Sequence, residues 1–121
     1  MREDSAYIIP LICKKGFLQI DPADVREIVM GNYAFFCVRG YGDYQKRFHE
    51  VLRKIPRIPY RRVLIQVEYH PSKEPLFSEI DLLTSRFPPF NCCIGFSELP
   101  ICSRPDVVIV RLLFWEPYFL F

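Results

Sequence analysis

Residues 107–115 read Val-Val-Ile-Val-Arg-Leu-Leu-Phe-Trp, and no other part of the chain is so apolar. Most of these residues are β-branched or aromatic, Pro105 and Pro117 bound the stretch, and Arg111 is its one charge. This pattern predicts a strand that is buried on both faces rather than a helix. Nine residues are also too few to cross a bilayer as a helix.

The chain continues past Pro117 with four apolar residues, Tyr-Phe-Leu-Phe at 118–121. Apolar ends of this kind typically dock on their own domain or on another molecule. We therefore expect residues 105–121 to form a strand followed by a docking tail.

Size and composition predict one folded domain over residues 1–121. The chain has 121 residues with 50% hydrophobic content, which is enough to bury one core but not two. Eleven prolines and 16% aromatic residues favour a proline-punctuated fold over a helical bundle. The net charge of +2 gives no overall field that would favour nucleic acid or membrane.

The first residues and the cysteines suggest where the protein works. Glu3 and Asp4 precede an apolar run that Pro10 interrupts, so we expect no signal or transit peptide and an intracellular protein with no membrane partner. The five cysteines are odd in number, lie in apolar runs and lack paired CxxC spacing. We expect buried, reduced thiols, no metal site and no cofactor.

Hydrophobic periodicity predicts an α+β fold. Expected strands lie at residues 6–13, 33–38, 63–69, 91–96 and 107–115. Expected helices begin at Asp21-Pro22, where Asp21 caps the helix, at Asp43, and at residues 72–75. The fold would be a single domain with a mixed or mainly antiparallel sheet of about five strands and three helices, packed mostly on one face.

Three strands carry more specific expectations. Pro10 places residues 6–13 at an edge of the sheet, because proline cannot donate to a central ladder. Residues 63–69 alternate, which predicts a half-exposed strand with Gln66 and Glu68 on the exposed side. The final strand is expected to pair antiparallel with residues 91–96.

Basic residues gather in the middle of the chain. Residues 44–62 hold seven Lys or Arg against Glu50, a local excess of +6 that leaves −4 for the rest. The residues are Lys46, Arg47, Arg53, Lys54, Arg57, Arg61 and Arg62. Apolar spacing puts Arg47 on the outer face of the expected helix. The segment predicts either a docking surface for an acidic partner or nucleic acid, or an ordinary solvated helix face.

No catalytic motif is found. His49 and His70 are the only histidines, and no nucleophile signature surrounds any cysteine, although spacing alone leaves a Cys–His pair open. We therefore expect no catalytic residues and no enzyme, with a thiol enzyme as the weaker alternative. A second alternative is a small nucleic-acid-binding protein that uses the basic segment.

The later part of the chain resembles the small nuclear polymer-forming protein of adenovirus early region four, the product of its third open reading frame. The resemblance rests on Asn91 opening a strand with Ile94 three residues later, and on the Val-x-hydrophobic-hydrophobic-x-Leu-x-Phe pattern of residues 107–114. The sequence departs from that family at Arg111, where the family has an acid, and in its apolar rather than acidic end.

This resemblance implies a self-associating viral early protein that captures host antiviral or DNA-repair factors in the host nucleus. Asn91 would then lie at the partner-capturing surface, and Ile109 in the strand that mediates assembly. The resemblance and the expected docking of the apolar tail together assign self-assembly to five residues: Ile109, Leu112, Phe114, Phe119 and Phe121.

Overall fold

Residues 2–16 and 18–117 are described by the computed structural model, which is an α+β domain with a mixed sheet, as the sequence predicts. In chain order the described elements are α1 (Arg2–Ile12), α2 (Pro22–Val29), β1 (Tyr33–Tyr41), α3 (Lys46–Lys54), β2 (Arg62–Tyr69), α4 (Phe77–Thr84), the short 3-10 helix η1 (Pro89–Asn91), β3 (Cys92–Glu98) and β4 (Val107–Trp115).

The four strands are ordered β1-β4-β2-β3. β4 runs antiparallel to both β1 and β2, so Leu112 lies opposite Phe36 on one side and Ile65 on the other. β2 and β3 are parallel, because α4 carries the chain back across the sheet between them. The expected pairing of the final strand with residues 91–96 is therefore wrong, although its burial is confirmed.

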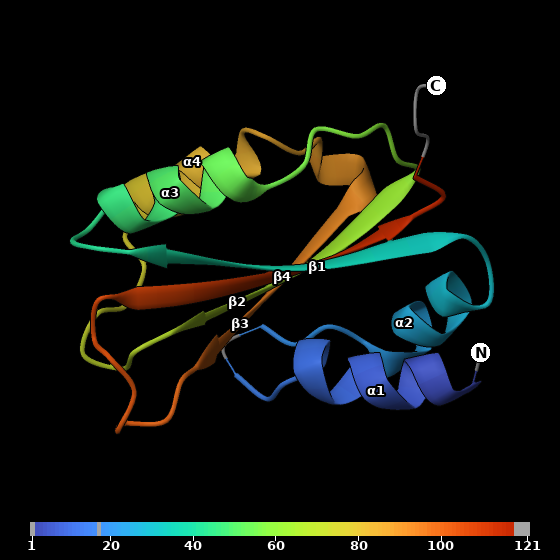
Figure 1. Cartoon of the computed structure of the whole chain (residues 1–121), viewed down its shortest axis with the longest axis horizontal. Helices are drawn as coiled ribbons and strands as arrows, with labels where there is room; N and C mark the ends of the chain where they lie inside the picture. Colours follow the sequence, from blue (N-terminus) through green and yellow to red (C-terminus); the bar gives the residue numbers. More distant parts are fainter. Residues whose placement is uncertain (1, 17, 118–121) are drawn as a thin grey trace.

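Helices cover both faces of the sheet (Figure 1). α3 and α4 pack on one face around Phe48, Val51 and Leu83. α1 and α2 pack on the other face around Ile12 and Ile28. The expectation that the helices lie mostly on one face is wrong, because the first apolar segment forms an additional helix on the opposite face.

That segment, residues 6–13, was predicted as an edge strand, but all of it except Cys13 belongs to the helix α1. Ile8 and Ile12 are one helical turn apart and both are buried, so the apolar pattern also fits a helix. Pro10 lies in the last turn, and the hydrogen bond it cannot donate would go to the carbonyl of Ala6, an exposed residue. The described sheet therefore has one strand fewer than expected.

β2 is buried on both faces, so the predicted exposure of Gln66 and Glu68 is also wrong. Both side chains have partners inside the protein, although the Oε1 of Gln66 has no hydrogen-bond partner among the described residues. The Nε2 of Gln66 donates to the Ser97 hydroxyl at 2.7 Å, and Glu68 pairs with Lys14 at 2.9 Å and with Arg111. The alternation in this strand therefore reflects buried polar side chains that pair within the protein rather than a solvent-exposed face.

α2 forms as the sequence predicts. The Asp21 carboxylate accepts a hydrogen bond from the Ala23 amide at 2.9 Å, and Pro22 occupies the first helical position. Among the described residues, no helix is both long and apolar enough to cross a membrane.

Candidate anion-binding site

The basic residues of the 44–62 segment separate into three groups in the structure. The first is Arg47 alone, which is fully buried. Its Nε and Nη2 donate to the two carboxylate oxygens of Glu79, each at 2.9 Å. The prediction that Arg47 lies on the exposed face is wrong, because α3 turns the side chains of Arg47, Phe48 and Val51 toward the rest of the protein.

The second group is engaged in local contacts. Lys54 binds Glu50 at 2.9 Å and the Arg39 carbonyl at 2.7 Å. Arg61 lies over the Trp115 ring, 4.7 Å from its centroid, and Arg62 contacts Asp24 at 3.3 Å. Because of these contacts, the three side chains are already engaged within the protein and are less available to bind a partner than the charge count of the sequence suggests.

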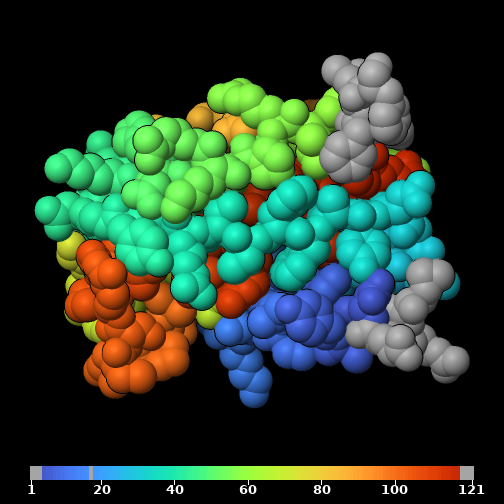
Figure 2. Space-filling view, in the orientation of Figure 1, coloured from blue at the N-terminus to red at the C-terminus, as the bar shows by residue number. Residues whose placement is uncertain are grey.

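The third group is a row of exposed side chains. Lys46, His49 and Arg53 follow one another at three and four residues along α3, and Arg57 is exposed in the loop after the helix. In Figure 2, the green atoms of α3 and of the loop after it form a continuous exposed surface. Arg53 and Arg57 form no ion pair within the described residues.

A groove of about 340 Å³ lies where this row meets the end of α4. Its lining is His49, Leu52, Arg53, Arg57, Leu82, Ser85 and Arg86, with no Asp or Glu among the described lining residues. We call this set of residues the basic groove.

Arg86 is the best-fixed cation of the basic groove. Its Nη1 donates to the Leu52 carbonyl and its Nη2 to the Ile55 carbonyl, each at 3.1 Å. Burial and the nearby charge of Arg57 lower the pKa of Arg86, but an arginine stays protonated in proteins. Like charges held close without a carboxylate between them favour the binding of an anion.

Sequence reasoning found Arg53 and Arg57, and it placed His49 on the same basic helix face, but it missed Arg86. Arg86 is distant in sequence and joins the groove only because α4 packs beside α3. The only sequence feature that points to Arg86 is its position between Leu83 and Phe87, which are both buried, near the end of a helix that the sequence predicts.

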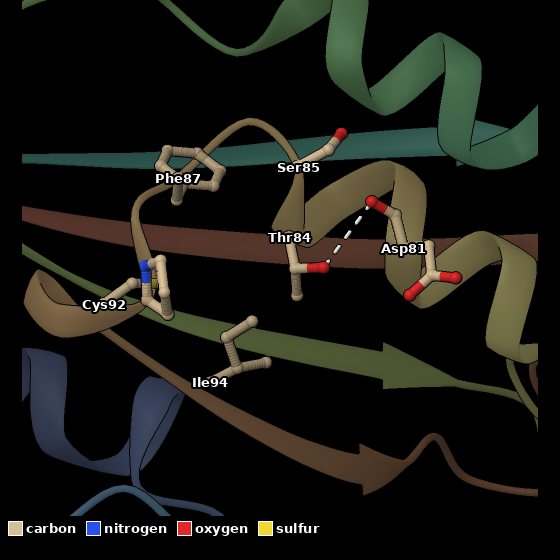
Figure 3. A pocket seen from close by; sticks show the side chains of 7 residues that line it. Asp81, Thr84, Ser85, Phe87, Cys92 and Ile94 are labelled. Carbon is tan, nitrogen blue, oxygen red and sulfur yellow. Dashed lines mark hydrogen bonds between the residues drawn. The ribbon is translucent and has the colours of Figure 1, made fainter.

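Another pocket, of about 470 Å³, contains side chains of nucleophilic types (Figure 3). The Thr84 hydroxyl donates to the Asp81 carbonyl at 3.5 Å, and the Ser85 hydroxyl donates to the Leu82 carbonyl at 2.9 Å. Burial and the nearby Cys93 raise the pKa of Cys92 to about 11, so its reactive thiolate form is scarce at neutral pH. This pocket therefore offers no activated nucleophile among its described residues.

The histidines and cysteines form no catalytic pair or metal cluster in the described part of the chain. His70 is held by the Ile101 carbonyl at 3.0 Å and the Ser72 amide at 3.1 Å. The described residues contain no group of three or more His, Cys, Asp or Glu placed to hold a metal ion. All five cysteines are free, but Cys37 and Cys102 are exposed and the other three half-buried, so their predicted burial is wrong.

The residues assigned to assembly and partner capture lie elsewhere. Leu112 and Phe114 are fully buried in the chain's own core, and Ile109 is half-buried in the same central strand. Phe119 and Phe121 lie outside the described residues. Asn91 ends η1, half-buried, with its Oδ1 lacking a hydrogen-bond partner among the described residues.

Comparisons with known proteins identify a fold but no family. No family model matches the chain, and no curated protein matches it. Among solved structures, it is similar to an FtsZ mutant from M. jannaschii, with a TM-score of 0.60, 16% identity, and coverage of 96% of this chain and 40% of that one. It is also similar to an FtsZ dimer from M. jannaschii, with a TM-score of 0.60, 21% identity, and coverage of 90% and 34%.

These comparisons correct the adenoviral resemblance. The structural neighbours are FtsZ proteins, and no sequence comparison links the chain to the adenoviral family. Apart from Asn91, which ends η1, the residues that suggested the resemblance are apolar positions of β3 and β4, a pattern that many buried strands share. The chain spans two fifths or less of the FtsZ chains, and the likeness concerns the fold alone, so it assigns no activity.

Proposed function

We propose that the protein is a non-enzymatic nucleic-acid-binding protein that contacts phosphates through the basic groove. The observation that carries this proposal is the convergence of Arg53 from α3, Arg57 from the loop after it and Arg86 from the turn after α4 on one groove, with no acidic lining residue among those described. Arginine suits this role because its planar guanidinium donates two parallel hydrogen bonds to phosphate.

The row on α3 favours a phosphate polymer over a single phosphate. Lys46 and Arg53 are seven residues apart, which is about 10 Å along a helix at 1.5 Å per residue. A single phosphate would occupy the basic groove and leave this row unused. A nucleic-acid strand would contact the row and the groove together, and release bound counterions from each neutralised phosphate.

The groove lining favours contacts to the backbone of nucleic acid rather than to its bases. No Phe, Tyr or Trp is among the described residues that line it, so it lacks the large aromatic rings on which bases usually stack. Arginine contacts to phosphate position a strand but carry no sequence information. We therefore expect binding that depends weakly on sequence.

The test uses fluorescence anisotropy of a labelled single-stranded oligonucleotide at low salt. The variant combines Arg53→Gln with Arg57→Gln, because both side chains are exposed and their loss leaves the core intact. The matched control is Arg26→Gln, an exposed arginine on α2, across the sheet from the groove. Because two phosphate contacts are lost, we expect affinity to fall about tenfold in the double variant and to stay near wild type in the control.

Two results would overturn the proposal. One is the absence of binding to single-stranded and duplex nucleic acid at low salt. The other is an equal loss in the double variant and the control, which would mean that net charge rather than the basic groove carries the affinity.

A further inference from the structure

A larger cavity, of about 880 Å³, opens at the carboxyl ends of the parallel strands β2 and β3. Its apolar lining includes Leu18, Tyr69, Phe77, Ile80 and Phe96, and it shares no lining residue with the basic groove. The volume is in the range of small-molecule sites, roughly 300–1,000 Å³, and such sites combine apolar walls with a few polar groups.

One wall of this cavity is fixed by a close backbone contact. The Phe96 amide donates to the Leu18 carbonyl at 2.9 Å, which holds residues near Gly16 against the edge of β3. A Cβ at position 16 would lie 2.0 Å from the Phe96 carbonyl oxygen, so the approach requires glycine. The cavity is thus bounded by fixed backbone on the side of β3.

Three side chains of this cavity, Tyr69, Glu74 and Glu98, have no partner among the described residues, whereas Ser97 accepts a hydrogen bond from Gln66. Tyr69 is only 7% exposed, and its hydroxyl has no hydrogen-bond partner among the described residues. Glu74 and Glu98 are exposed at the rim and form no ion pair within the described part of the chain. Burial, then the charges of Glu74 and Glu98, raise the pKa of Tyr69, and all three residues line the same cavity.

The charge of the lining is acidic. Glu74 and Glu98 contribute −2 and Lys15, the one basic lining residue described, contributes +1, which leaves −1. The cavity therefore repels the phosphates expected at the basic groove. Phe77, 88% exposed at the mouth, adds an aromatic face of the kind that attracts cations.

We propose that this cavity binds an organic ammonium cation with an apolar body. The apolar body would occupy the space between Leu18, Ile80 and Phe96, where its burial is favourable. The ammonium group would lie at the rim beside Glu74 and Glu98, with the Tyr69 hydroxyl directed at its polar end.

The test is calorimetric titration of the whole chain with benzyltrimethylammonium. Its neutral isostere, neopentylbenzene, has the same shape without the charge, and tetramethylammonium has the charge without the apolar body. We expect the aromatic cation to bind more tightly than either partial probe. The variant Glu74→Gln with Glu98→Gln should lower its affinity about tenfold, since two exposed carboxylates are removed.

Glu27→Gln is the matched control, because Glu27 is exposed on α2 and does not line the cavity. The inference is overturned if no probe binds, if the neutral isostere binds as tightly as the cation, or if the control loses as much affinity as the double variant. A dimer of the chain is the alternative occupant of the cavity. If the protein dimerises but binds no cation, and Phe77→Asp abolishes the dimer while Phe90→Asp does not, the cavity would bind a second copy and the inference would be overturned. Phe90 is the matched control, because both phenylalanines are 88% exposed. The variant with Arg53→Gln and Arg57→Gln should leave cation binding unchanged. Cation binding at the cavity can therefore be tested independently of nucleic-acid binding at the basic groove.

Discussion

Arg47 of α3 and Glu79 of α4 form a two-point ion pair in which neither side chain is exposed. Glu79 also accepts hydrogen bonds from the amides of Gln45 and Leu76, at 2.9 and 3.0 Å. One carboxylate therefore joins the start of α3 to the start of α4. Because the basic groove is formed farther along the same two helices, this ion pair sets the geometry of the proposed binding site.

Replacing Glu79 by Gln should strongly destabilise the fold. The change leaves the buried Arg47 charge without its partner, and breaking such pairs lowers the free energy of unfolding by about 3–5 kcal/mol. Urea unfolding followed by circular dichroism measures the effect. Glu27→Gln, on the exposed side of α2, should change stability by less than about 0.5 kcal/mol. Equal losses in the two variants would contradict the role assigned to the ion pair.

The same carboxylate makes stability depend on pH. Burial raises the pKa of Glu79, but the hydrogen bonds from Arg47, Leu76 and Gln45 outweigh burial and hold the pKa below its ordinary value of 4.5. A carboxyl group with a lowered pKa in the folded state stabilises the protein above its unfolded pKa, and this contribution is lost as pH falls through the folded pKa. Urea midpoints should therefore fall below pH 4.5, and should fall less in a variant with Arg47→Met and Glu79→Leu. An identical decline in that variant would exclude Glu79 as a source.

Gly40 of β1 should not tolerate a side chain. A Cβ there would lie 1.8 Å from the Arg47 carbonyl oxygen, so α3 would have to move away from the sheet. We expect Gly40→Ala to lower the free energy of unfolding by about 1–3 kcal/mol, as overpacking does. Gly31→Ala is the control, because its nearest contact is Trp115 at 3.3 Å and the side chain can shift. A Gly40→Ala variant as stable as the control would show that α3 does not pack this closely.

The thiols should react in two classes. Burial, with the nearby charge of Asp21, raises the pKa of Cys13 to about 11, and burial with Cys93 does the same for Cys92. Cys37 and Cys102 are exposed on the surface. In the native protein an aromatic disulfide reagent should modify Cys37 and Cys102 first, with peptide mass spectrometry identifying the sites. Fast modification of Cys92 would revive the thiol-enzyme alternative.

The sequence predicts the central strand and the general fold because residues 107–115 are apolar on both faces. It fails at residues 6–13, where a short apolar run fits a strand and a buried helix equally well. It fails again at Gln66 and Glu68, whose partners Ser97, Lys14 and Arg111 are distant in the chain. Burial of a polar side chain depends on such partners, which local alternation does not reveal.

The candidate site is predictable only in part for the same reason. The excess of positive charge in residues 44–62 points to Arg53 and Arg57, but it counts the buried Arg47 with them. Charge counting does not distinguish an exposed cation from one paired in the core, because that difference depends on Glu79, 32 residues away. Arg86 becomes part of the basic groove only through the packing of α4 beside α3.

The salt dependence of oligonucleotide binding tests the central claim most directly. The slope of log affinity against log salt should be negative for the wild-type chain. In the variant with Arg53→Gln and Arg57→Gln the slope should be less steep by about 1.4, because each phosphate contact to a single strand contributes about 0.7 to its magnitude. Arg26→Gln should keep the wild-type slope. A double variant with an unchanged slope, or binding that ignores salt, would contradict the assignment of nucleic-acid binding to the basic groove.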